Sequence, residues 1–177
     1  MLLLALSGAN AADQEKLRIG EFIPVTPPQP APEAAFTDAG GKPASLGEFA
    51  GKPAVVNLWA TWCRPCLKEM PSLDRLQAQF AGRLTVAAVA EDRGGGEVVA
   101  PFAAKLNLEH LKIYLDPKAE LEHALQVRGL PTSIVLDAQG RIVGKVEGPA
   151  EWDSAKMTGI LEPLLGKSGP ELKKAAR

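Results

Sequence analysis

The only two cysteines of this chain, Cys63 and Cys66, are three positions apart and directly follow an apolar run at residues 54–60. Such a run is typical of a buried strand, so the spacing places a dithiol where a strand turns into a helix. The thiolate is the reactive form of cysteine, and the unpaired N–H groups of a helix start favour it. We therefore predict that Cys63 attacks a substrate disulfide and that Cys66, one turn further and shielded, resolves the mixed disulfide.

A structural disulfide and a metal site are the alternatives. A bridge across so short a loop constrains the unfolded chain little, because loop-closure stabilisation grows with loop length. Two cysteines supply only two soft ligands, and His110 and His123 lie far along the chain with no matching ligand spacing. The pattern favours thiol–disulfide exchange with no metal and no cofactor. Copper held by both cysteines and a histidine stays open as an alternative.

Composition suits one globular domain with appendages, since 46% of the 177 residues are apolar and the net charge is −1. That charge implies neither a nucleic acid nor a charged membrane surface as a partner. Residues 1–12 combine a short apolar stretch with an Ala-x-Ala site, which is typical of the end of an export signal. The stretch is too short to cross a bilayer. We expect a signal or anchor remnant and a periplasmic protein, tethered to the membrane only through its N-terminus.

The pattern along the chain predicts a proline-rich tether at residues 13–33, one domain at residues 34–166 and a flexible tail at residues 167–177. Within the domain we expect an N-terminal hairpin with a glycine turn, and a helix after the dithiol with Pro71 inside it. The further elements expected are strands at 84–90 and 112–115, helices at 97–106 and 117–126, a strand hairpin at 132–136 and 141–146, and a helix from residue 151. The expected fold class is α/β, with a mixed central sheet flanked by helices on both faces.

The order of these motifs resembles that of the thioredoxin-like proteins. A buried strand leads into Trp62 and the Cys-x-x-Cys pair, a proline-interrupted helix follows, and Pro131 precedes a hairpin. The resemblance covers residues 34–165, with an extra αβ insertion before Pro131, as in the membrane-tethered periplasmic TlpA/ResA/CcmG branch. The strings most similar to TlpA are residues 59–63, 68–71, 130–133 and 148–152.

The resemblance implies roles at the predicted site. It makes Cys63 the nucleophile, Cys66 the resolving thiol and Pro131 a cis-proline beside the pair. The backbone of Leu130 is then expected to hydrogen-bond an extended client segment, as in strand addition. Trp62 is expected to cover the dithiol with an apolar face for docking, whereas Trp59 is expected in the core.

Glu69 lies on the helix face that carries Cys66, and no basic residue stands three or four positions away to hold it outward. Because a glutamate of the related proteins lies near the active site, we predict that Glu69 shuttles a proton to or from Cys66. An ordinary solvated glutamate is the alternative. Asn57 occupies the strand position at which cytoplasmic thioredoxins place a buried acid, so their proton route does not transfer to this chain.

The resemblance also implies a monomeric reductase that acts on client proteins with reducible disulfides. An oxidising compartment keeps exposed dithiols oxidised, so the expected partner is a membrane electron donor of the DsbD/CcdA type. TlpA acts on copper-site cysteines in cytochrome oxidase assembly, and this is the client class that we expect. Reduction of apocytochrome c during cytochrome c maturation and copper carriage remain the alternatives.

Overall fold

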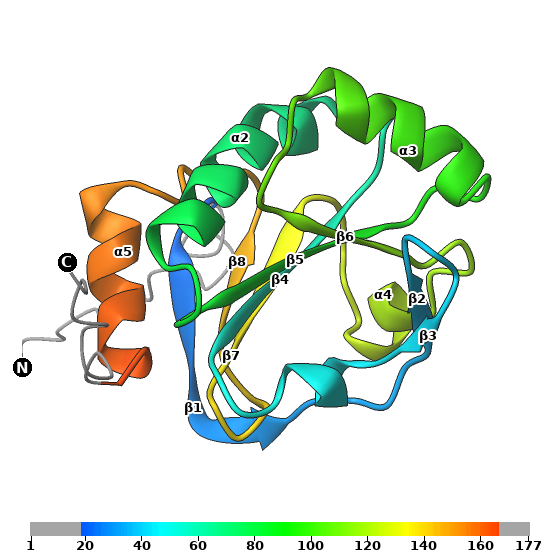
Figure 1. Cartoon of the computed structure of the whole chain (residues 1–177). Helices are drawn as coiled ribbons and strands as arrows, with labels where there is room; N and C mark the ends of the chain where they lie inside the picture. The colour runs from blue at the N-terminus through cyan, green and yellow to red at the C-terminus, as the bar shows by residue number, and fades with distance from the viewer. Residues whose placement is uncertain (1–18, 167–177) are drawn as a thin grey trace, which may run out of the picture.

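The computed structural model describes residues 19–166, which form an eight-stranded mixed sheet with helices on both faces (Figure 1). The strand order is β1-β8-β7-β4-β5-β6-β2-β3. The strands are β1 (Phe22–Pro30), β2 (Phe36–Asp38), β3 (Pro43–Ala44), β4 (Ala54–Trp59), β5 (Thr85–Ala90), β6 (Lys112–Leu115), β7 (Thr132–Leu136) and β8 (Arg141–Glu147). The helices are η1 (Leu46–Phe49), α2 (Arg64–Gln79), α3 (Gly96–Lys105), α4 (Glu120–Ala124), α5 (Ala155–Leu161) and η2 (Glu162–Leu164).

The predicted α/β fold is confirmed. Strand β4 pairs in parallel with β5 and antiparallel with β7, so the sheet is mixed. Strands β2 and β3 form the expected N-terminal hairpin, and α3 with β6 forms the extra αβ insertion. The predicted export remnant, the first part of the tether and the tail lie outside the described residues. No helix within residues 19–166 has the length and apolar content needed to cross a membrane.

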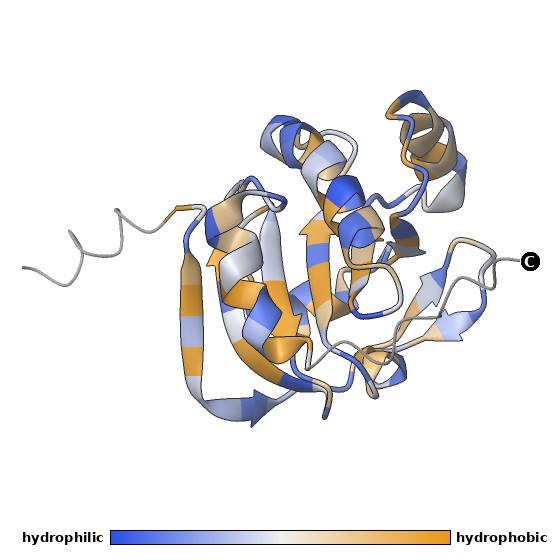
Figure 2. Ribbon diagram, turned by 60° about the vertical axis from the view of Figure 1, so that its left-hand side comes forward, coloured by the Kyte–Doolittle hydropathy of each residue, from blue (hydrophilic) through white to orange (hydrophobic). Residues whose placement is uncertain are grey.

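The central strands β4 and β5 are buried along their whole length, and apolar residues are frequent along the strands of the sheet (Figure 2). The side chains of β4 and β5 alternate between two apolar clusters. Val55 and Trp59 belong to the cluster that packs against α2 and α5. Val56 and Leu58 belong to the cluster beneath η1 and α4. Burial on both faces explains why the sequences of these strands are nearly continuous apolar runs.

Helix α2 carries its apolar face toward the first cluster, through Met70, Leu73 and Leu76. The helical spacing of these residues predicted this face, because positions three and four apart lie one above the other. Pro71 lies within the helix, which continues through it to Gln79. The dithiol is thereby fixed to a helix that packs along the sheet.

The prediction of an unpacked tether is wrong for residues Phe22–Pro30. This stretch forms β1, an edge strand that pairs antiparallel with β8. Proline lacks an N–H group and is therefore confined to edge strands and irregular positions of a sheet. The register shifts between Pro24 and Gln29, and Pro27 and Pro28 lie inside this irregular part. An edge strand tolerates these prolines because it pairs along one side only.

Two helices begin later than predicted. The helix expected at 117–126 is confined to Glu120–Ala124, because the carboxylate of Asp116 accepts the N–H groups of Glu120 and Leu121 and ends the preceding turn there. The helix expected from residue 151 begins at Ala155, with Ser154 as its N-cap. Residues 150–153 instead pack against α2, where they become part of the candidate site.

Candidate active site

Cys63 and Cys66 form a disulfide at the start of α2, with Cα atoms 5.3 Å apart. Cys63 is the N-cap residue, and its Sγ accepts the N–H group of Cys66 at 3.3 Å. This N–H and the helix dipole favour negative charge on the Cys63 sulfur. Cys63 has 5% of its surface exposed, whereas Cys66 is fully buried. Of the two cysteines, only Cys63 therefore keeps any exposed surface.

The loop before β7 carries two of the predicted client-binding residues, Leu130 and Pro131. The Leu130–Pro131 bond is cis, as predicted. Leu130 packs against the apolar cluster that contains both cysteines, and its backbone N–H and C=O have no hydrogen-bond partner among the described residues. Trp62 is 70% exposed, and it lines a cleft together with Leu130. Trp59 is fully buried, as predicted.

Glu69 is buried, with 2% of its surface exposed, so the alternative of a solvated helix glutamate is wrong. Its Oε1 accepts a hydrogen bond of 2.7 Å from Asn57 Nδ2. Its Oε2 accepts from the backbone N–H of Ala150 at 3.0 Å and from Trp152 Nε1 at 3.3 Å. Three donors, one from β4 and two from the segment at residues 150–153, therefore converge on one carboxyl group one helical turn from Cys66.

Burial raises the pKa of Glu69 from its ordinary 4.5 to about 7, because removal from water disfavours the charged form. The hydrogen bonds from Ala150, Asn57 and Trp152 act in the opposite direction, since they stabilise the carboxylate. Because the effect of burial is larger than that of the hydrogen bonds, the Glu69 carboxyl group gains and loses a proton near neutral pH. Such a pKa suits a general acid or base.

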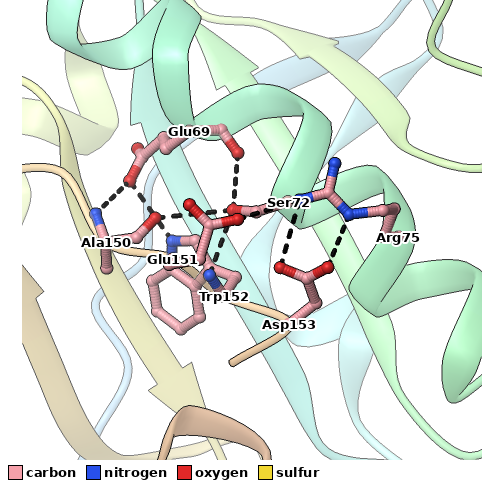
Figure 3. A network of polar contacts seen from close by, with 7 residues as sticks. All are labelled: Glu69, Ser72, Arg75, Ala150, Glu151, Trp152 and Asp153. Carbon is pink, nitrogen blue, oxygen red and sulfur yellow. Dashed lines mark hydrogen bonds and ion pairs between the residues drawn. The ribbon is translucent and has the colours of Figure 1, made fainter. Parts of the chain in front are cut away.

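The segment that supplies two of these donors is held against α2 (Figure 3). Ser72 Oγ accepts the N–H of Trp152 at 3.0 Å and donates to the carbonyl oxygen of Glu69 at 2.8 Å. On the exposed side, Arg75 pairs with Glu151 and Asp153. The same segment begins beside the cis-proline, where the N–H of Gly148 donates to the carbonyl of Pro131 at 2.8 Å.

Sequence reasoning missed the partners of Glu69. Asn57 donates both to Glu69 and to Ser133 Oγ on β7, so it joins α2 to the strand that follows Pro131. Trp152 is fully buried. A polar residue in an otherwise apolar strand, as Asn57 is in β4, was the one signal available for this network. The partners Ala150 and Trp152 carry no such signal.

Within residues 19–166, no group of three or more His, Cys, Asp or Glu residues is placed to hold a metal ion. His110 and His123 are exposed residues.

A thioredoxin-like sheet with a Cys-x-x-Cys pair at the start of a helix and a cis-proline loop defines the class of thiol:disulfide oxidoreductases. Residues 27–161 match the family described as Redoxin. The chain belongs to this family, within its TlpA-like group of thiol–disulfide oxidoreductases.

Curated relatives and solved structures agree with this assignment. The thiol-disulfide oxidoreductase ResA of Bacillus cereus is 31% identical over 173 residues, which cover 93% of each chain. The thioredoxin-like protein YneN of Bacillus subtilis is 31% identical and covers 80% of this chain and 84% of its own. A crystal structure assigned as a thiol:disulfide interchange protein DsbE from Chlorobium tepidum superposes with a TM-score of 0.70 at 26% identity, over 78% of this chain and 97% of the other.

Proposed function

We propose that this oxidoreductase works as an exported reductase of client disulfides. The unequal exposure of the two cysteines supports this proposal most directly, because Cys63 keeps 5% of its surface exposed while Cys66 is fully buried. The Cys63 thiolate attacks one sulfur of a client disulfide, forms a mixed disulfide and releases the other client sulfur as a thiolate. The Cys66 thiolate then attacks Cys63 Sγ, which releases the second client sulfur and closes the Cys63–Cys66 disulfide. Two electrons pass to the client.

Glu69 acts in the second step. A buried Cys66 thiol must lose its proton before it can attack, and burial disfavours the free thiolate. The Glu69 carboxylate, one helical turn away, takes that proton, and its pKa of about 7 allows the transfer near neutral pH. In the reverse direction the protonated carboxyl returns the proton as Cys66 leaves the disulfide.

The cis-proline loop and Trp62 receive the client. The N–H and C=O groups of Leu130, which have no partner within residues 19–166, offer hydrogen bonds to an extended segment that adds beside them. Pro131 has no N–H group to compete for that segment. Trp62, exposed directly before Cys63, supplies an apolar docking face.

The proposed clients are copper-site cysteines of cytochrome oxidase assembly, on the strength of the TlpA-like strings around Trp62, Glu69, Pro131 and Trp152. In a periplasmic location, a membrane donor of the DsbD/CcdA type reopens the Cys63–Cys66 disulfide after each cycle. Apocytochrome c reductases use the same chemistry on different clients, so the client must be found by experiment.

Trapping with Cys66→Ser tests the proposal. This variant stalls at the mixed disulfide, so clients remain bound to Cys63 and can be identified by mass spectrometry, whereas Cys63→Ser serves as the control that traps none. Copper-site proteins among the trapped partners support the client class, and apocytochromes alone would replace it. A measured reduction potential near the thioredoxin value of about −270 mV supports a reductase, and one near about −120 mV would reverse the direction of electron flow.

A further inference from the structure

A cleft of about 490 Å³ opens beside the proposed client-binding residues. Trp62, Gly129 and Leu130 line one part of it. Glu91, which follows β5, and Glu122, in α4, line another part. A client segment that pairs with Leu130 therefore passes its side chains across a cleft that contains two carboxyl groups.

Glu91 is 9% exposed, and its Oε1 atom has no hydrogen-bond partner within residues 19–166. Leaving a buried polar atom unpaired costs free energy, so this oxygen gains from any donor that reaches it. Burial and the facing carboxyl of Glu122 raise the pKa of Glu91 to about 9. Glu91 is therefore protonated at neutral pH.

The surrounding charges separate into a buried acidic part and an exposed basic rim. Asp116 and Asp92 add negative charge near Glu91 and raise its pKa further. Both already accept hydrogen bonds from neighbouring backbone N–H groups, so they need no further donor. Arg93, Lys118 and His123 also line the cleft, but all of them are exposed to solvent.

The cleft is suited to an organic cation. The described residues place no third metal-ligating side chain with this pair in a metal-holding group. A lysine or arginine side chain combines a cationic end, which can donate to both carboxylates, with an apolar stem. The exposed ring of Trp62 offers a surface on which such a stem can pack.

We propose that this cleft is a client subsite for a basic side chain, in which a lysine or arginine of the client binds between the carboxyl groups of Glu91 and Glu122. The client side chain enters as a cation, and Glu91 releases its proton to solvent. This inference rests on the proposed function, because the subsite selects among clients that the same dithiol reduces.

Disulfide-bonded peptides test the subsite kinetically. A set of synthetic peptides carries one lysine at each position that flanks the cysteines, and every member is matched by a norleucine peptide with the same stem and no charge. At one position we expect reduction of the lysine peptide to exceed that of its norleucine partner about tenfold in kcat/KM, as for one charge-assisted hydrogen bond. Glu91→Gln and Glu122→Gln should each abolish this ratio. Glu97→Gln, an exposed glutamate of α3 outside the cleft, should keep it.

The outcomes separate the subsite from the reductase activity. Equal rates for all lysine and norleucine partners, or a ratio that survives both variants, would overturn the subsite. Failure to reduce any peptide would count against the reductase instead. Calorimetry then tests the subsite independently by measuring binding. It uses the oxidised protein and the same peptides with serine in place of cysteine. Tighter binding of the lysine peptide with release of a proton, seen in two buffers of different ionisation enthalpy, supports the subsite, and equal binding refutes it.

Discussion

Asn57 and Glu69 are joined inside the core by a hydrogen bond of 2.7 Å, from the side-chain amide of a β4 residue to a carboxyl oxygen on α2. Both side chains are buried. The Oδ1 atom of Asn57 has no partner among the described residues. Asn57 can therefore turn its amide and present an acceptor in place of a donor, so that the contact persists whether or not Glu69 carries a proton.

Glu69→Gln should slow the second step of disulfide exchange far more than the first. The glutamine amide can face a turned Asn57 while its oxygen keeps the donors Ala150 and Trp152, so the fold is preserved. Reaction of the reduced protein with DTNB reports both steps, because attack by Cys63 and resolution by Cys66 each release one TNB anion. We expect the second release to slow about 10²-fold near pH 7 and the first to change little.

This difference should shrink only well above about pH 8.5, the value at which a free thiol ionises, because burial of Cys66 disfavours its thiolate. Glu97→Gln, on the exposed surface of α3, is the matched control and should leave both phases unchanged. Equal slowing of both phases at every pH would remove Glu69 from the resolving step.

The same variant should also change how stability depends on pH. The pKa of Glu69 is about 7 in the folded chain and near 4.5 when the chain unfolds, so the unfolded chain loses this proton first as the pH rises. The wild type therefore loses stability between about pH 4.5 and 7 relative to Glu69→Gln, by on the order of 3 kcal/mol, and the difference is constant above pH 7. Urea unfolding of both proteins at a series of pH values measures it. A pH-independent difference would show that Glu69 titrates normally.

Trp152→Phe should raise the pKa of Glu69. The indole N–H stabilises the carboxylate, and phenylalanine keeps an aromatic ring without this donor. The pH midpoint of the second TNB release should therefore move upward. Trp59→Phe is a matched control, because Trp59 is equally buried but its Nε1 has no partner among the described residues. If both variants shift the midpoint equally, the effect comes from repacking and not from the hydrogen bond.

The parts of this structure that the sequence predicts well are local in the chain. Cys63 at the start of α2 and the apolar face of that helix follow from spacings of three and four residues. The network around Glu69 joins residues far apart, since Asn57 precedes it by 12 positions and Trp152 follows it by 83. No periodic sequence pattern indicates that such distant residues come into contact. Burial of Glu69 could therefore be suspected, but its hydrogen-bond partners could not be named.

Strand β1 shows a different limit. The prolines of residues 22–30 indicate an extended backbone, and that part of the prediction is correct. Whether an extended segment is free or paired depends on the strand beside it. Here β8 is the strand that pairs with β1. The sequence of β8 does not indicate which segment pairs with it.

Ser72→Ala should cost more stability than Arg75→Ala, although Arg75 makes two ion pairs. Ser72 is buried, and its loss leaves the buried N–H of Trp152 without its acceptor, at a cost of about 1–3 kcal/mol. The Arg75 side chain is 54% exposed, and surface ion pairs contribute little to stability. Chemical denaturation of both variants tests this order. A larger loss for Arg75→Ala would mean that the ion pairs with Glu151 and Asp153 hold the segment.

Gly144→Ala should loosen the β1 edge strand. Pro24 of β1 pairs with Gly144 of β8, and the ring of Phe22 lies directly over the glycine, so that an added Cβ would overlap the ring. Phe22 packs against the core cluster on α2 and therefore has to give up contacts when it moves. We expect a loss of about 1 kcal/mol in the wild type. In a Phe22→Ala background the overlap is gone, so Gly144→Ala should cost less there, and a double-mutant cycle measures this coupling. Additive losses would show that the ring does not rest on Gly144 and that β1 is held by its backbone pairing alone.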